Sequence, residues 1–220
     1  MRAEDVAHYL QGNPKFFEDY AEFMAHIVIP HPHSGRAISI TERQMLSLRD
    51  RNRELEGKLA ELIQFGEEND AISERMHRLA VGLAAAATLP SVLNALHYHL
   101  REDFMVPQVF IRLWDQPRNA GELPDFVEVG EELQVFAETL QRPYCGNTSG
   151  FETAAWFGPE AGRMRSQALV ALRDSGGTIG MLAMGSEDSQ RFYAEMGTLY
   201  LERLGELISA ALLRAIRLQA

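Results

Sequence analysis

Residues 41–87 contain no proline, and large apolar side chains recur in them at alternating intervals of three and four residues. This spacing is typical of a coiled-coil seam, and Thr41 is a suitable N-cap for such a helix. A helix of this length would extend about 70 Å. Its surface outside the apolar stripe is polar, so such a helix is not stable alone. The pattern therefore predicts a long helix that pairs with a second copy of the chain. The seam residues are Met45, Leu48, Leu55, Leu59, Leu62, Phe65, Ile72, Met76, Leu79 and Leu83.

Asn52 falls on an a position of this heptad pattern, between Met45 and Leu59. A buried Asn at such a position often selects a two-stranded pairing in register. Beyond Leu62 the seam slips by one residue to Phe65, which predicts a stammer or a local bend. We expect a parallel homodimer.

The long helix divides the chain into three expected parts: residues 1–40, 41–87 and 88–220. The first part reads as short helices over residues 3–27, divided at "GNP" (12–14), followed by a loop. His31 and His33 lie in that loop, but two histidines alone specify no metal geometry. We interpret them as solvated side chains and expect no metal site.

Residues 88–220 carry the pattern of an α+β domain. Helices are predicted over 89–104, 131–140 and 196–218, and strands over 106–115 and 126–129. A hairpin is predicted over 166–186, turning at residues 174–177. This order predicts a short antiparallel sheet with helices from both ends of the domain covering one face.

The charge balance limits the classes of partner. The chain has a net charge of −10 and a pI of about 5.2, which argues against broad binding to nucleic acid or anionic membranes. The start "MRAEDVAHYL" lacks the apolar centre of a signal peptide, and no apolar run reaches the roughly 18 residues that span a bilayer. We expect a cytoplasmic protein with neither nucleic-acid nor membrane partners.

The stretch "MLAMGSEDSQRFYAEMGT" (181–198) has the strand, turn and helix order of phosphate-binding loops. It lacks the P-loop spacing and contains no lysine, and Glu187 and Asp188 would repel a phosphate. The Asp188 carboxylate can instead accept hydrogen bonds from the following backbone N–H groups. We interpret this stretch as a structural corner.

Several segments together resemble a known bacterial family. They are "YLQGNPKFF" (9–17), "RPYCG" (142–146), "SQALVAL" (166–172) and "IGMLAMGSEDSQRFYAEMGTLYL" (179–201). The chain is similar over nearly its whole length to the family called domain of unknown function 484. The resemblance implies an N-terminal helical segment and a C-terminal domain similar to GAF domains, which commonly bind small molecules and dimerise through long helices.

The leading hypothesis is therefore a non-enzymatic sensory or regulatory module, dimeric through its coiled coil. A small ligand would bind near Arg112 and Trp114, which share a strand face, with Cys145, Trp156 and Ser166 in segments that border it. The competing interpretation is that both tryptophans fill the core and that Arg112 pairs with an acid. No cofactor is predicted, and the identity of any ligand is open.

The alternative is a ligand-free dimeric scaffold that recruits a protein partner through the aromatic N-terminal helices. The residues that favour it are Phe16, Phe17, Tyr20 and Phe23. An enzyme is the third possibility. Methionine sulfoxide reduction needs a second thiol to resolve the first, and Cys145 is the only cysteine. No Ser–His–Asp or paired-carboxylate pattern is present either, so we expect no catalytic activity.

Overall fold

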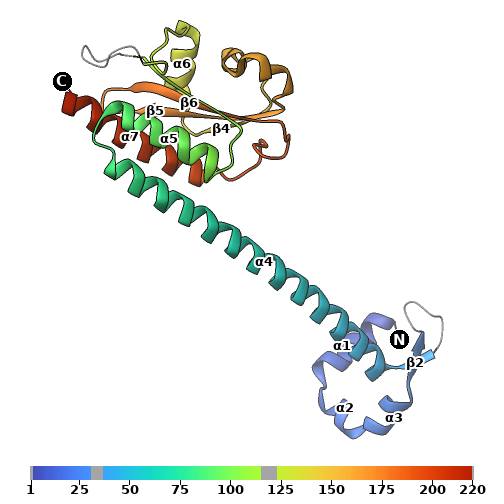
Figure 1. Cartoon of the computed structure of the whole chain (residues 1–220). Helices are drawn as coiled ribbons and strands as arrows, with labels where there is room; N and C mark the ends of the chain where they lie inside the picture. Colours follow the sequence, from blue (N-terminus) through green and yellow to red (C-terminus); the bar gives the residue numbers. More distant parts are fainter. Residues whose placement is uncertain (1, 31–36, 115–122, 220) are drawn as a thin grey trace. The chain divides into compact units, whose positions relative to one another are not determined.

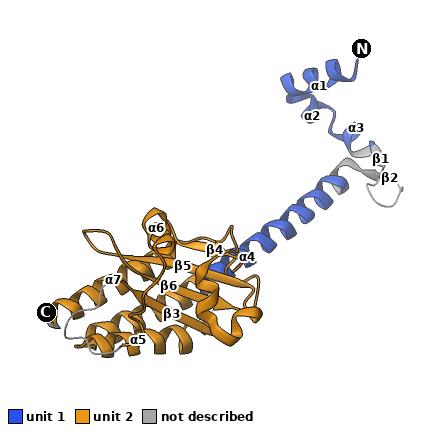
Figure 2. Ribbon diagram, turned by 90° about the horizontal axis from the view of Figure 1, so that it is seen from above, with its two compact units in different colours: residues 1–67 blue, residues 68–220 orange. Residues whose placement is uncertain are grey.

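The computed structural model describes residues 2–30, 37–114 and 123–219. The chain divides into two compact units, residues 1–67 and 68–220 (Figure 2), and the boundary falls inside the long helix α4 (Ile40–Ala85). The predicted long helix is confirmed. Among the described residues, no helix has the length and apolar character needed to cross a membrane.

The first unit begins with three short helices where two were expected. They are α1 (Ala3–Gly12), α2 (Lys15–Asp19) and α3 (Ala21–His26). Tyr20 separates α2 from α3 because its backbone leaves the helical conformation, at φ −118° and ψ 33°. The expected loop contains a small antiparallel pair, β1 (Val28–Pro30) with β2 (Ala37–Ser39). His31 and His33 lie outside the described residues.

Helix α4 exposes the apolar seam of its N-terminal half. Met45, Leu48, Leu55, Leu59, Leu62 and Phe65 each retain between 48% and 66% of their accessible surface in the single chain. Leu79 and Leu83, in the C-terminal part of the same pattern, are fully buried in the core of the second unit. The second part of the seam is therefore used within the chain, which corrects its assignment to the coiled coil.

The second unit is built on a four-stranded antiparallel sheet in the order β3-β6-β5-β4. The strands are β3 (Gln108–Leu113), β4 (Tyr144–Gly146), β5 (Ser166–Arg173) and β6 (Thr178–Ser186). The predicted β5–β6 hairpin is confirmed. Its turn is closed by Asp174, whose N–H donates to Gly177 O and whose carboxylate accepts from the N–H groups of Gly176 and Gly177.

Helices cover both faces of this sheet, whereas one covered face was expected. Helices α5 (Leu89–Glu102) and α7 (Leu199–Gln219) lie on one face together with the end of α4, and α6 (Glu131–Thr139) lies on the other (Figure 1). A 3₁₀ segment, η1 (Glu152–Arg163), joins α6 on that second face. The α+β fold class, with a long helix leading into an antiparallel sheet, is confirmed.

Three local predictions need correction. Residues 126–129 form no strand, while β4 and η1 were not expected. Strand β4 is only three residues long, too short for a period-two pattern to show. The η1 segment breaks at Gly158, which adopts φ +55° ahead of Pro159, so no helical periodicity runs through it.

Candidate functional site

The five residues predicted to surround a ligand do not form one group. Along β3 the side chains alternate as expected, and Phe110 and Trp114 pack in the cluster on the α6 face. Trp156 belongs to the same cluster, whereas Cys145 belongs to the core on the α5–α7 face. Ser166 shares its strand face with Ala168 and Val170, which are also in the α5–α7 core. The expected convergence therefore holds for Arg112, Trp114 and Trp156 and fails for Cys145 and Ser166.

Arg112 is held between aromatic rings and a backbone carbonyl. Its Cζ lies 5.5 Å from the centroid of the Trp156 ring and 5.8 Å from that of Phe110. Its Nη1 donates a hydrogen bond of 2.7 Å to Pro124 O. Burial lowers the pKa of Arg112, and the negative charge of Asp125 acts in the opposite direction. Within the described ranges no carboxylate forms an ion pair with Arg112, so its charge is balanced only at longer range.

A recess of about 190 Å³ opens beside Arg112. Its polar lining consists of His97 and Arg101 from α5, Arg112 from β3, and Asp125. His97 Nε2 lies 3.0 Å from the buried Asp125 Oδ1, so one acid is already paired with one imidazole. His97 Nδ1 is buried and has no hydrogen-bond partner in the described part of the chain. The polar lining thus combines two guanidinium groups with a His97–Asp125 pair, and guanidinium groups are donors suited to a small anion.

Cys145 is a poor candidate for covalent chemistry. It is buried in the α5–α7 core, and burial raises the pKa of its thiol to about 11. The thiolate is the reactive form, so little of it exists at neutral pH. In the part of the chain that the structure covers, no cluster of three or more His, Cys, Asp or Glu is arranged to hold a metal.

The corner after β6 is structural, as the sequence indicated. Asp188 Oδ1 accepts a hydrogen bond from Gln190 N at 2.8 Å, and Ser186 Oγ accepts one from Asp188 N at 3.1 Å. Ser166 Oγ donates to Asp188 O at 2.6 Å, which ties the start of β5 to this turn. The hydroxyl of Ser166 is therefore occupied by the fold rather than offered to a ligand.

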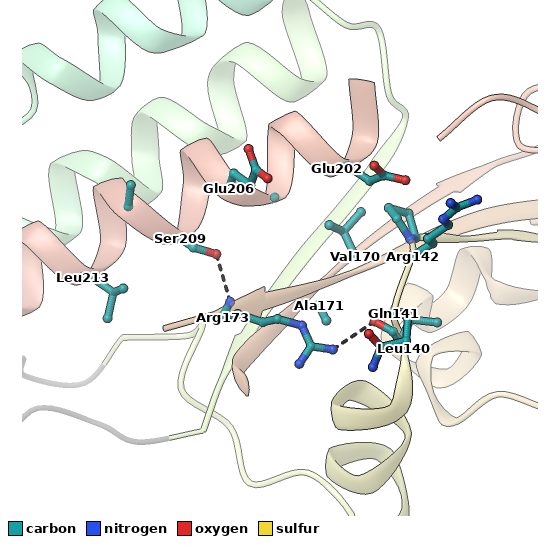
Figure 3. A pocket seen from close by; sticks show the side chains of 13 residues that line it. Leu140, Gln141, Arg142, Val170, Ala171, Arg173, Glu202, Glu206, Ser209 and Leu213 are labelled. Atoms are coloured by element: carbon teal, nitrogen blue, oxygen red, sulfur yellow. Dashed lines mark hydrogen bonds between the residues drawn. The ribbon is translucent and has the colours of Figure 1, made fainter. Parts of the chain in front are cut away.

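A larger groove, of about 460 Å³, was not foreseen from the sequence. It lies between α7 and the segment Leu140–Pro143, beside β5 (Figure 3). Its charged lining is Arg142, Arg173, Glu202 and Glu206. These residues come from three separate stretches of the chain, and each looks like an ordinary surface charge when read alone.

Comparison with known proteins places the chain in a family. It matches the family described as "Protein of unknown function, DUF484" over residues 1–216, and it belongs to that family. No protein with a curated function matches it.

Solved structures share the fold of its second unit. The GAF domain of a phosphoenolpyruvate-protein phosphotransferase from Coxiella burnetii superposes with a TM-score of 0.51 at 16% identity, covering 66% of this chain and 94% of that one. The GAF domain of the Acinetobacter phosphoenolpyruvate-protein phosphotransferase gives 0.50 at 15% identity, covering 67% and 96%. A free methionine-R-sulfoxide reductase from Neisseria meningitidis gives 0.49 at 18% identity, covering 67% and 91%. The two GAF domains show that the α+β domain has a GAF-like fold.

The environment of Cys145 predicts slow thiol chemistry in the folded protein. A shift of the pKa from 9.0 to about 11 lowers the thiolate fraction about a hundredfold at pH 8. We expect 5,5′-dithiobis(2-nitrobenzoate) to react with the native protein at least that much more slowly than with the protein unfolded in guanidinium chloride. Equal rates in the two states would contradict the buried placement of Cys145.

Proposed function

We propose that this member of the DUF484 family is a homodimeric regulatory protein without catalytic activity. Two GAF-like domains are joined by a parallel coiled coil of the N-terminal half of α4, and a small anion binds in the recess beside Arg112. The observation that carries this proposal is the exposed apolar seam between Met45 and Phe65.

The exposed seam supports a second copy of the chain as its occupant. Burying one Leu side chain contributes about 1.5–3 kcal/mol, so leaving six large apolar side chains in water is unfavourable. The seam follows the 3–4 alternation that lets two identical helices interlock, and Asn52 occupies one of its a positions. Among the residues that the structure describes, the Asn52 amide donates only to Glu56 on its own helix, at 3.4 Å. A facing Asn52 would give it a partner across the seam.

The charges beside the seam favour a parallel arrangement. In the register with Asn52 at a, Arg51 falls at g and Glu56 at the following e position. In a parallel dimer a g residue faces the next e residue of the partner helix, so Arg51 and Glu56 would pair across both sides of the interface. An antiparallel dimer would bring g residues against g residues instead, and Arg51, like Lys58 at the next g position, is basic.

Substituting Leu59→Glu is expected to dissociate the dimer. The change removes a seam side chain from each helix and places two carboxylates at the interface, which raises the dissociation constant by a factor on the order of 10³. Sedimentation equilibrium should report twice the 24.7 kDa chain mass for the wild type and a single chain for the variant. Arg53→Glu, on the outer face of the same helix, is the control and should remain dimeric. A monomeric wild type, or a variant as dimeric as the control, would rule out the seam as the interface.

The ligand part of the proposal is supported by the Arg112 recess. The guanidinium is already fixed by Pro124 O and the Trp156 ring, so little side-chain entropy remains to be lost on binding. Since Arg112 forms no ion pair with a described carboxylate, its charge is available to pair with an anion.

Arg112→Gln should abolish copurification of the anion. Native mass spectrometry of protein purified from its own host is expected to show excess mass that is released on denaturation, and this excess should disappear in Arg112→Gln. Arg203→Gln is the matched control, because Arg203 also stacks on an aromatic ring, 5.8 Å from the Tyr200 centroid, outside the recess. Bare mass in the wild type, or excess mass retained by Arg112→Gln, would refute binding at this recess.

A second candidate function is a scaffold that recruits a protein through the N-terminal helices. Phe17, Tyr20 and Phe23 are 41%, 54% and 60% exposed, while Phe16 is half-buried and stacks on Tyr20 with centroids 4.7 Å apart. The N-terminal helices also contain five acidic residues, which suits a partner that is both apolar and basic. They are Glu4, Asp5, Glu18, Asp19 and Glu22.

The scaffold makes a separate prediction. The double variant Phe17→Ser, Phe23→Ser should lose a protein that copurifies with the wild type, because the aromatic contacts supply the burial at such an interface. Lys15→Ser, an exposed change at the start of α2, should retain it. Identical copurifying proteins in all three preparations would argue against recruitment through these helices.

A further inference from the structure

The groove beside β5 exists because β4 is much shorter than its neighbour. Strand β4 pairs with Gln167, Ala168 and Leu169 only, while β5 continues to Arg173. The chain leading into β4, Leu140–Pro143, forms one wall of the groove, and α7 forms the other (Figure 3). Its volume of about 460 Å³ is within the range of small-molecule sites.

The floor of the groove presents main-chain hydrogen-bonding groups. In an antiparallel sheet, successive residues of a strand direct their backbone N–H and C=O groups to opposite sides. Trp114 N donates to Ile179 O, which fixes this alternation in β6 and, through the β6–β5 pairing, in β5. The backbone groups of Gln167, Leu169 and Ala171 are therefore directed toward the β4 edge. The first two of these residues pair with β4, and Arg173 N at the far end donates to Ser209 Oγ at 3.0 Å. Ala171 lies beyond the residues that pair with β4. It is partly exposed, and its N–H and C=O are directed into the groove.

Charges of opposite sign line the two walls. Arg142 stands on the Leu140–Pro143 side, and Glu202 and Glu206 stand on α7 (Figure 3). Glu202 accepts a hydrogen bond from Thr198 Oγ1. Arg142 and Glu206 are exposed, and neither forms an ion pair with a described residue. The walls can therefore bind a cation on one side and an anion on the other at the same time.

Arg173 has a different role, at the end of the groove. Its Nη2 donates to Ala137 O and Leu140 O at 2.8 and 2.9 Å, and its Nη1 donates to Thr178 Oγ1 at 3.2 Å. These acceptors are neutral groups, and two of them are carbonyls at the C-terminal end of α6, so Arg173 fixes that end of the helix. This bond network holds the Leu140–Pro143 wall in place (Figure 3).

We propose that this groove binds a zwitterion with an apolar side chain, either a free α-amino acid or a short peptide. The ligand's carboxylate would face Arg142 and the Ala171 N–H, and its ammonium would face Glu206 and the Ala171 C=O. The apolar side chain would contact Leu140, Val170 and Leu213, which also line the groove. This site is separate from the Arg112 recess, and the proposal does not depend on the function proposed above.

Titration of the full-length protein with L-leucine and with leucyl-leucine tests this inference. In ¹H–¹⁵N TROSY spectra, either ligand should shift the Ala171 amide in a saturable way below about 10 mM. A response to leucine alone identifies a free amino acid as the ligand, and a tighter response to the dipeptide identifies a peptide. 4-Methylpentanoate and 3-methylbutylamine carry one charge each and should bind at least tenfold more weakly.

Two exposed variants locate the binding. Arg142→Gln and Glu206→Gln should each weaken the response at least tenfold, and both changes lie at the surface, where they leave the core intact. Arg217→Gln and Glu195→Gln make the same changes outside the groove and should bind as the wild type does. The inference is overturned if neither zwitterion shifts Ala171, if the singly charged analogues bind equally well, or if the two groove variants bind unchanged.

Discussion

The packing of the end of α4 into the sheet domain is the interaction on which the rest of the structure depends. Leu79 and Leu83 are fully buried between α4, α5 and α7, and removing such a side chain costs about 2–5 kcal/mol. Arg214 of α7 reinforces this contact by donating to Leu83 O and Ala86 O, both at 2.7 Å. These carbonyls lie at the C-terminal end of α4, where the helix cannot satisfy them itself. The end of the long helix is thus an integral part of the GAF-like core.

This anchoring gives the two parts of one heptad pattern different partners. The seam residues Leu79 and Leu83 are buried within the chain, whereas the seam residues between Met45 and Phe65 are exposed. The change follows the slip in spacing between Leu62 and Phe65, which rotates the seam around the helix. A ligand that altered the packing of α5 or α7 would act on α4 directly, because Gly82 allows His99 of α5 to lie against the backbone of α4.

The long helix and the β5–β6 hairpin could be predicted because each depends on a repeating pattern or a local turn. The heptad spacing covers more than ten turns, and Asp174–Gly177 contains the polar and glycine residues that a tight turn requires. Strand β4 and the 3₁₀ segment η1 could not be predicted. Strand β4 has only three residues, and a glycine interrupts η1, so neither shows a repeating pattern.

The same limit applied to the candidate site. Alternation within β3 placed Arg112 and Trp114 correctly, whereas the face of Cys145 depends on the pairing of β4 with β5, which only the fold determines. The groove could not be predicted for the same reason, since Arg142, Ala171 and Glu206 come together only because β4 does not begin until Tyr144.

Oxidative cross-linking of Asn52→Cys tests most directly whether the exposed part of α4 pairs in parallel with a second copy. In that arrangement the two introduced thiols face each other, while Cys145 is buried and does not compete. We predict a covalent dimer of twice the 24.7 kDa chain mass under denaturing, non-reducing conditions. Arg53→Cys, which turns its thiol away from the seam, should give none. Chains of single mass after oxidation of Asn52→Cys, or equal cross-linking at both positions, would contradict the account.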